Sequence, residues 1–250
     1  MVKIENEIKL IAIDMDGTLL NENYEISDYT KSMIVHAQNN GIQVILSTGR
    51  PIEFSYNFHL ELGLTSDLVT TNGAQVWSAD KQLLKEHTFE SYIAEDLWHY
   101  GNLNDYYMWM VATNELFRYS SRPENFHNYK WIKLGFGRLT KEQKNAVLNK
   151  VNIYSELEVT SSSRSNVEVN VKNVNKATGL KLICDRLGIT FDNMVAIGDS
   201  LNDKSMIKAA QIGVAMDNAI PEIKEVSDYI TDSNKSDGVG KFIERLLNEM

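Results

Sequence analysis

The chain has 250 residues, of which 43% are hydrophobic and 24% charged, and its formal net charge is −9. This balance predicts a globular protein with a substantial core and excludes intrinsic disorder. The acidic charge and the lack of a Lys/Arg-rich run exclude a nucleic-acid partner, because phosphate backbones bind basic surfaces. Apolar runs are short and no signal pattern begins the sequence, which predicts a cytoplasmic protein with no membrane partner.

Short apolar segments alternate with helical patterns at the start of the chain. Residues 8–13 are rich in β-branched side chains and predict a buried strand. Ser27 is a helix N-cap, apolar residues at helical spacing follow it, and Gly41 ends that helix. Residues 43–46 predict a second strand, and residues 51–62 predict a further helix with proline at its start.

The last third of the chain repeats this alternation. Residues 176–187 predict a helix, residues 194–197 a strand, and residues 212–216 a second strand after another helix. Strands that alternate with helices predict an α/β fold, here a doubly wound, Rossmann-like parallel sheet with helices on both faces.

The middle of the chain differs in composition, since it holds three of the four Trp residues and most of the Tyr residues. We therefore expect residues 83–174 to form an inserted smaller α/β domain, and residues 1–82 and 175–250 to form the core domain. Within the insertion, the alternating residues 167–171 predict a half-exposed strand, and residues 141–151 predict an amphipathic helix.

Two carboxylates, Asp14 and Asp16, stand two residues apart directly after the first predicted strand, and Gly17 permits a sharp turn behind them. A carboxylate at this position can attack phosphorus and form an acyl phosphate. The second can protonate the leaving oxygen and later deprotonate water. The alternative is that Asp-Gly only forms a turn after a strand.

Two further acids, Asp199 and Asp203, follow the strand predicted at residues 194–197. The carboxyl ends of parallel strands share one edge of a sheet, so these acids are expected near Asp14. Mg²⁺ prefers oxygen ligands of this kind, and Asp199 is the expected direct ligand. The alternative is a helix N-cap, a common role for Asp.

Three residues could bind a phosphoryl group. The Thr48 hydroxyl and the backbone N–H groups around Gly49 lie where a strand meets a helix, which suits phosphate oxygens. Lys176 could add a positive charge. The alternatives are an ordinary strand-to-helix turn and a solvated surface lysine.

The residues named above belong to a series of short motifs along the chain. In order, the motifs are Asp14-Met15-Asp16-Gly17-Thr18-Leu19-Leu20, Ser47-Thr48-Gly49-Arg50-Pro51, Thr71-Asn72-Gly73-Ala74, Lys176, Gly198-Asp199-Ser200-Leu201-Asn202-Asp203, Gly213-Val214-Ala215-Met216-Asp217-Asn218-Ala219 and Asp237-Gly238-Val239. This series resembles the Cof-type branch of the haloacid dehalogenase superfamily of phosphotransferases. The resemblance covers nearly all of the predicted core, whereas the middle region resembles the family's cap only in position and size.

The resemblance implies that Asp14 is the nucleophile and Asp16 the general acid-base. It implies that Mg²⁺ is held by the side chains of Asp14 and Asp199 and by the main-chain carbonyl of Asp16.

The resemblance also implies a phosphate site. Thr48 and Lys176 would bind the phosphoryl oxygens with help from Asn202, and Asp203 would orient Lys176 or a metal-bound water. The family usually has Gly after the motif Lys, whereas this chain has Ala177.

The implied function is Mg²⁺-dependent hydrolysis of small phosphomonoesters, such as sugar phosphates, with the cap selecting the substrate. One alternative is a phosphotransferase of the hexose phosphomutase type, because that superfamily includes such mutases. Another is a non-catalytic module that is phosphorylated at Asp14, as in receiver domains, although these lack a large cap and the second aspartate. We expect a monomer or a homodimer.

Overall fold

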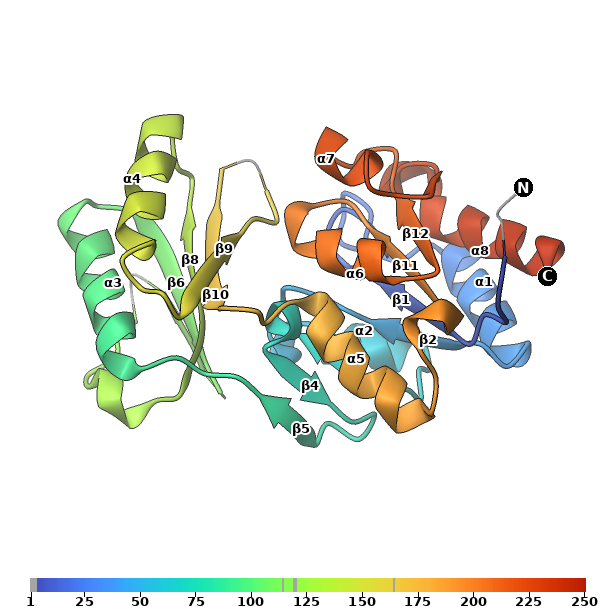
Figure 1. The fold of residues 1–250 in the computed structure, drawn as a ribbon, viewed down its shortest axis with the longest axis horizontal. Helices are drawn as coiled ribbons and strands as arrows, with labels where there is room; N and C mark the ends of the chain where they lie inside the picture. Colours follow the sequence, from blue (N-terminus) through green and yellow to red (C-terminus); the bar gives the residue numbers. More distant parts are fainter. Residues whose placement is uncertain (1–3, 114, 119–120, 164) are drawn as a thin grey trace. The chain divides into compact units, whose positions relative to one another are not determined.

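The computed structural model describes residues 4–113, 115–118, 121–163 and 165–250. The chain divides into two compact units, each with its own hydrophobic core. Unit 1 comprises Met1–Leu84 and Lys176–Met250, and unit 2 comprises Lys85–Asn175. Figure 1 shows the chain leaving unit 1, forming unit 2 and returning.

The main sheet of unit 1 has five parallel strands in the order β13-β12-β11-β1-β2. Their bounds are β1 (Leu10–Ile13), β2 (Gln43–Leu46), β11 (Met194–Gly198), β12 (Ile212–Ala215) and β13 (Tyr229–Ile230). All four residues of the central strand β1 are buried, as expected for a parallel strand that is covered on both faces. In the register of the sheet, Ile13 lies opposite both Leu46 and Ile197, so these three strands end at one edge.

The helices of unit 1 are α1 (Asp28–Asn39), α2 (Tyr56–Glu61), α5 (Lys176–Leu187), α6 (Lys204–Ala209), α7 (Pro221–Lys224) and α8 (Gly238–Glu249). Helix α1 packs against α8, and α5 packs against α6 (Figure 1). The predicted cap of α1 is present, since Ser27 Oγ accepts a hydrogen bond from the Thr30 N–H. The predicted fold class, a doubly wound parallel sheet with an additional smaller α/β unit, is confirmed.

One predicted helix, over residues 51–62, is wrong in its extent. A 3-10 helix, η1 (Ile52–Phe54), comes first, and α2 begins only at Tyr56. Ser55 separates the two with φ −119°, and its Oγ donates to the Pro51 carbonyl. Serine hydroxyls compete for backbone partners in this way, which interrupts a regular helix.

A small second sheet contains β3 (Leu68–Thr70) and β4 (Gln75–Trp77) of unit 1 and β5 (Leu83–Glu86), within which unit 1 ends at Leu84. The turn between β3 and β4 holds Thr71 and Asn72 at positive φ, of 49° and 58°. The Thr71 N–H donates to the Arg50 carbonyl, and the Asn72 N–H donates to the Thr48 carbonyl. The turn is therefore bound to the loop that follows β2.

Unit 2 contains an antiparallel sheet in the order β7-β6-β8-β10-β9, with two helices packed against it. Its elements are α3 (Ser91–Leu103), β6 (Tyr107–Ala112), β7 (Glu115–Arg118), β8 (Trp131–Gly137), α4 (Lys141–Val151), β9 (Leu157–Thr160) and β10 (Val167–Val171). The amphipathic helix predicted over residues 141–151 is confirmed as α4, which begins with a capping box between Thr140 and Gln143.

The short 3-10 helices elsewhere in the chain are η2 (Thr71–Gly73), η3 (Phe126–Asn128), η4 (Phe191–Asn193), η5 (Leu201–Asp203) and η6 (Asn234–Ser236).

The prediction of a half-exposed strand over residues 167–171 is wrong. Strand β10 lies between β8 and β9, and Glu168 and Asn170 are only 3% and 2% exposed. Glu168 forms a buried ion pair of 2.7 Å with Lys133 of β8. Because Lys133 replaces water as the partner of the Glu168 carboxylate, this polar position of the alternating pattern can be buried.

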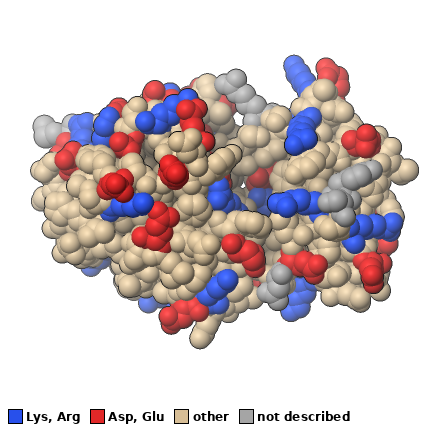
Figure 2. All heavy atoms as spheres, turned by 180° about the vertical axis from the view of Figure 1, so that it is seen from behind, with Lys and Arg blue, Asp and Glu red and all other residues tan. Residues whose placement is uncertain are grey.

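Charged side chains of both signs are mixed on the face of the molecule shown in Figure 2, where Lys and Arg are interspersed with Asp and Glu. Of the helices that the described residues form, none is long and apolar enough to cross a bilayer.

Candidate active site

The chain turns sharply where β1 ends at the sheet edge. The Asp14 N–H still donates to the Ile197 carbonyl at 3.0 Å, which continues the pairing of β1 with β11. Gly17 then adopts φ +81°, and a Cβ atom added to it would lie 2.7 Å from Asp199 Oδ2. Glycine is required here both for its backbone conformation and for the close approach of Asp199.

Lys176, the first residue of α5, is completely buried and joins two acids. Its Nζ donates to Asp14 Oδ1 at 2.5 Å and to Asp203 Oδ1 at 2.6 Å. Burial opposes the charge, but attraction to the two carboxylates is stronger and raises the pKa of the Lys176 amine. The alternative of a solvated surface lysine is therefore wrong.

Asp199 and Asp203 occupy the turn between β11 and α6. Asp199 Oδ1 accepts from the Thr18 hydroxyl at 3.1 Å, and Asp199 Oδ2 accepts from the Ser200 hydroxyl at 2.9 Å. Asp203 Oδ2 accepts from the backbone N–H groups of Asp199 and Ser200, each at 2.9 Å. Both oxygens of Asp203 are thus engaged, one by the backbone and one by the Lys176 amine.

Three carboxylates meet at this edge. Oxygens of Asp14, Asp199 and Asp203 all lie within 4.8 Å of one another. Burial, reinforced by repulsion from Asp203, raises the pKa of Asp14 well above its ordinary value and that of Asp199 to about 7. The Lys176 amine bonds to two of these three acids, so the cluster favours a further cation, and hard oxygen donors of this kind fit Mg²⁺.

Asp16 has a different environment from Asp14, although the two share one turn. Its side chain is 45% exposed, whereas that of Asp14 is 5% exposed. Both Asp16 oxygens accept from the guanidinium of Arg50, Oδ1 from Nη2 at 2.5 Å and Oδ2 from Nε at 2.7 Å.

Thr48 and Gly49, which are predicted to bind phosphate, lie in the loop that follows β2. Because Ile13 lies opposite Leu46, the loop containing Thr48 and Gly49 begins beside Asp14 at the same sheet edge. Thr48 is buried and its Oγ1 accepts from the Arg50 N–H at 3.1 Å. Gly49 is half-buried.

Asn202 is also buried near a turn of the second sheet. Its Nδ2 donates to Asn72 Oδ1 at 3.2 Å. Its Oδ1 is buried and finds no hydrogen-bond donor among the described residues. A buried polar atom in this state can accept a hydrogen bond from a ligand.

The structure adds residues to which the sequence analysis gave no role. Thr18 binds Asp199, Arg50 binds Asp16, and Asn72 binds Asn202. Each lies inside a matching segment, but only Asn72 has a local signal, since Asn before Gly is typical of turns with positive φ.

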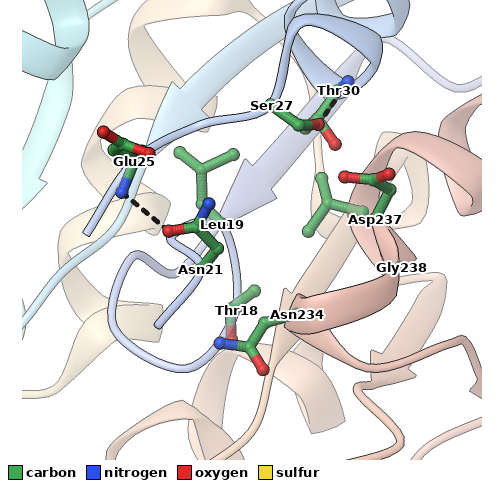
Figure 3. Close-up of a pocket in the computed structure, with 10 residues that line it drawn as sticks. Thr18, Leu19, Asn21, Glu25, Ser27, Thr30, Asn234, Asp237 and Gly238 are labelled. Carbon is green, nitrogen blue, oxygen red and sulfur yellow. Dashed lines mark hydrogen bonds between the residues drawn. The ribbon is translucent and has the colours of Figure 1, made fainter. Parts of the chain in front are cut away.

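The segment that contains Asp237 and Gly238 lines a small cavity together with Thr18 and Leu19 (Figure 3). Asp237 adopts φ 58°, and a Cβ atom on Gly238 would lie 1.9 Å from the Asp232 carbonyl. Asn234 Nδ2 donates to the Leu20 carbonyl at 2.8 Å. This hydrogen bond joins the segment to the residues that follow the Asp14 turn. The cavity is lined by Thr18, Leu19, Asn21, Glu25, Ser27, Thr30, Asn234, Asp237, Gly238 and Val239.

Comparison with known proteins gives consistent matches along the chain. The model of the haloacid dehalogenase-like hydrolase family matches residues 11–136 and 129–243. The chain is 41% identical over 237 residues to the Bacillus subtilis 5-amino-6-(5-phospho-D-ribitylamino)uracil phosphatase YcsE, with 95% of each protein covered. It is 29% identical to the phosphatase YwpJ of the same organism, over 96% of this chain and 100% of the relative. A solved haloacid dehalogenase-like hydrolase from B. subtilis superposes with a TM-score of 0.87 at 27% identity, over 96% of this chain and 100% of that one.

Proposed function

This chain belongs to the haloacid dehalogenase-like hydrolase family and is an enzyme, and we propose that it hydrolyses small phosphomonoesters through a phospho-aspartate at Asp14. One observation carries the proposal: the buried Asp14 carboxylate is held at 2.5 Å by the Lys176 amine at the edge where the strands end. A carboxylate fixed beside a buried cation can act as a nucleophile toward an anionic phosphoryl group.

Two half-reactions follow from this arrangement. In the first, an Asp14 oxygen bonds to phosphorus as the bond from phosphorus to the ester oxygen breaks, and Asp16 gives its proton to that oxygen. In the second, Asp16 takes a proton from water, the water oxygen bonds to phosphorus, and the bond to Asp14 breaks. The products are an alcohol and inorganic phosphate, and Asp16 is again protonated.

The phosphoryl oxygens would be bound by the Lys176 amine, the Thr48 hydroxyl, the Gly49 N–H and the Asn202 amide. Asp203 supports Lys176, since it accepts from the Lys176 amine at 2.6 Å while its other oxygen is held by the backbone. These groups would be in place before the substrate binds, so they would need little reorganisation during the reaction.

Mg²⁺ would be held by the side chains of Asp14 and Asp199 and by the main-chain carbonyl of Asp16. The cluster of carboxylate oxygens supports this assignment. Asp203 is the least available of the three, because the Lys176 amine and two backbone N–H groups engage its oxygens, whereas those of Asp199 accept from two hydroxyl groups, which can rotate. When bound, the ion neutralises negative charge on the phosphoryl group.

The proposed substrate class follows from the relative YcsE, which is 41% identical over 95% of both proteins. We propose 5-amino-6-(5-phospho-D-ribitylamino)uracil, or a small metabolite phosphorylated on a similar alcohol. The leaving group of such an ester is an alkoxide, which needs protonation as the ester bond breaks, and Asp16 would supply that proton. Unit 2, as the cap, would select the substrate.

The test is phosphate release from a panel with Mg²⁺, containing the ribitylaminouracil phosphate, sugar phosphates and an aryl phosphate. We expect multiple turnovers and fastest release from the ribitylaminouracil compound. Inactivity of the folded protein on the whole panel would contradict the proposal. Isomer formation without phosphate release would indicate a mutase, and a single phosphorylation of Asp14 without turnover would indicate a phospho-acceptor module.

A further inference from the structure

Arg50 lies at the carboxyl edge of the main sheet, yet the proposed reaction gives it no role. Its guanidinium forms a two-point ion pair with Asp16, through bonds of 2.5 and 2.7 Å. The planar fork of a guanidinium matches a carboxylate in this geometry, which is the most directional ion pair that side chains form. The orientation of the Asp16 carboxylate is therefore tied to that of Arg50.

Arg50 is itself held from several sides. Its Nη1 donates to the Phe54 carbonyl at 3.3 Å, and its N–H donates to Thr48 Oγ1 at 3.1 Å. The rings of Tyr24 and Phe58 lie 5.8 and 5.6 Å from the guanidinium carbon. Only 22% of the side chain is exposed. The guanidinium is thus a fixed point within unit 1.

We propose that Arg50 is a positioning residue for Asp16, holding the carboxyl group that transfers the proton in both half-reactions. This inference rests on the proposed function.

The need for such a residue follows from the environment of Asp16. Its side chain is 45% exposed, so without a partner it could adopt several rotamers in water. A general acid must lie within hydrogen-bond reach of the leaving oxygen, and a shift of about 1 Å can cost about a hundredfold in rate. Two bonds from a fixed guanidinium restrict the carboxyl group to one place.

The ion pair is compatible with proton transfer. When an Asp16 oxygen carries the proton, the hydrogen bond from Arg50 to that oxygen is lost and the hydrogen bond to the other oxygen remains. When the proton has passed to the leaving oxygen, the lost hydrogen bond forms again. Asp16 therefore stays attached to Arg50 in both of its protonation states.

The experiment compares two substrates, an alkyl phosphate and 4-nitrophenyl phosphate, in wild type, Arg50→Gln and Arg50→Lys. The value of kcat/KM reports the steps up to loss of the leaving group, and a nitrophenolate leaves without a proton. We expect Arg50→Gln to lower kcat/KM for the alkyl phosphate by about 10- to 100-fold, and for the aryl phosphate by less than about threefold. Arg50→Lys should recover part of the loss, since it keeps the charge but not the fork.

A double-mutant cycle with Asp16→Asn isolates the coupling. Once Asp16 is removed, Arg50→Gln should change the alkyl kcat/KM by less than about twofold, because the two residues act as one unit. The matched control is Arg186→Gln in α5, which removes another Arg–Asp pair of unit 1, the 2.7 Å contact with Asp67. The control variant should leave kcat/KM unchanged for both substrates.

Two outcomes would overturn the inference while leaving the proposed function intact. One is an equal loss for both substrates in folded Arg50→Gln, which would mean that Arg50 binds the phosphoryl group. The other is that Arg50→Gln lowers the alkyl kcat/KM by the same factor in the Asp16→Asn protein as in the wild type. Inactivity of the wild type toward every substrate would instead overturn the proposed function.

Discussion

The Asp14 carboxylate is buried and accepts a hydrogen bond of 2.5 Å from the Lys176 amine, and its substitution by amide tests its role directly. Asp14→Asn keeps the volume of the side chain but cannot form an acyl phosphate. We expect steady-state phosphate release to fall below about a thousandth of the wild-type rate. Circular dichroism should show an unchanged fold.

The matched control for this variant is Asp185→Asn on the same helix as Lys176. Asp185 is exposed and pairs with Lys181 four residues earlier. It should keep wild-type activity. Residual turnover of Asp14→Asn above about a thousandth would place the nucleophile elsewhere.

Gly17 gives a second prediction at the scale of one residue, with Gly41 as its control. Both glycines have φ +81°, but a Cβ atom at Gly41 would meet nothing within 4 Å, whereas at Gly17 it would lie 2.7 Å from Asp199 Oδ2. Gly41→Ala should therefore lower the free energy of unfolding only by the backbone strain, about 1 to 2 kcal/mol. Gly17→Ala should cost more and should also lower activity by displacing Asp199. Urea unfolding and kcat measure the two effects, and equal costs with full activity would contradict the interpretation.

Among the elements, β8 and β10 of unit 2 share the buried pair of Lys133 and Glu168. Lys133→Met would leave Glu168 charged and buried, although the Ser162 hydroxyl still donates to it at 2.6 Å. We expect a loss of about 3 to 5 kcal/mol in the free energy of unfolding. Adding Glu168→Leu to this variant should recover much of the loss, because neither charge of the pair is then buried.

Urea unfolding measures both variants. The control is Lys181→Met, which removes the ion pair of Lys181 with Asp185, two side chains that are each more than half exposed. This variant should change the free energy of unfolding by less than about 0.5 kcal/mol. A Lys133→Met protein as stable as the wild type would show that the pair is unimportant.

For the whole molecule, Mg²⁺ binding should appear as a gain in stability. At a concentration of a hundred times Kd, an ion that binds only the folded state adds about 2.7 kcal/mol. Mg²⁺ should therefore raise Tm, and a chelator should reverse the rise. Asp199→Asn should show a much smaller rise, and an equal rise in this variant would place the ion elsewhere.

The same measurement should depend on pH. The pKa of Asp199 is raised from its ordinary 3.8 to about 7, chiefly by burial and next by Asp203. In the metal-free protein this group therefore lowers stability as pH rises from 3.8 toward 7. Mg²⁺ needs the ionised form and must displace a proton below pH 7, so the rise in Tm should be larger at pH 8 than at pH 6. A pH-independent rise would contradict this.

Features that depend on residues close together in the chain could be predicted from the sequence. The apolar strand β1, the Ser27 cap and helix α5 all follow from local composition and spacing, and the acids come directly after strands. The alternation of strands and helices then determined the parallel sheet, because successive parallel strands require a helical crossover. Asp14 and Asp199 were expected at one edge for that reason.

Which side chains of distant segments meet could not be predicted in this way, because it depends on how the chain packs. The Lys176 amine reaches an acid 162 residues earlier in the chain, and Arg50 reaches one 34 residues earlier. Such pairs depend on strand register and on helix packing, for which a short segment carries no signal. For the same reason Glu168 is buried, although its alternating pattern predicts exposure. A charged side chain can leave water only when another part of the chain supplies its partner.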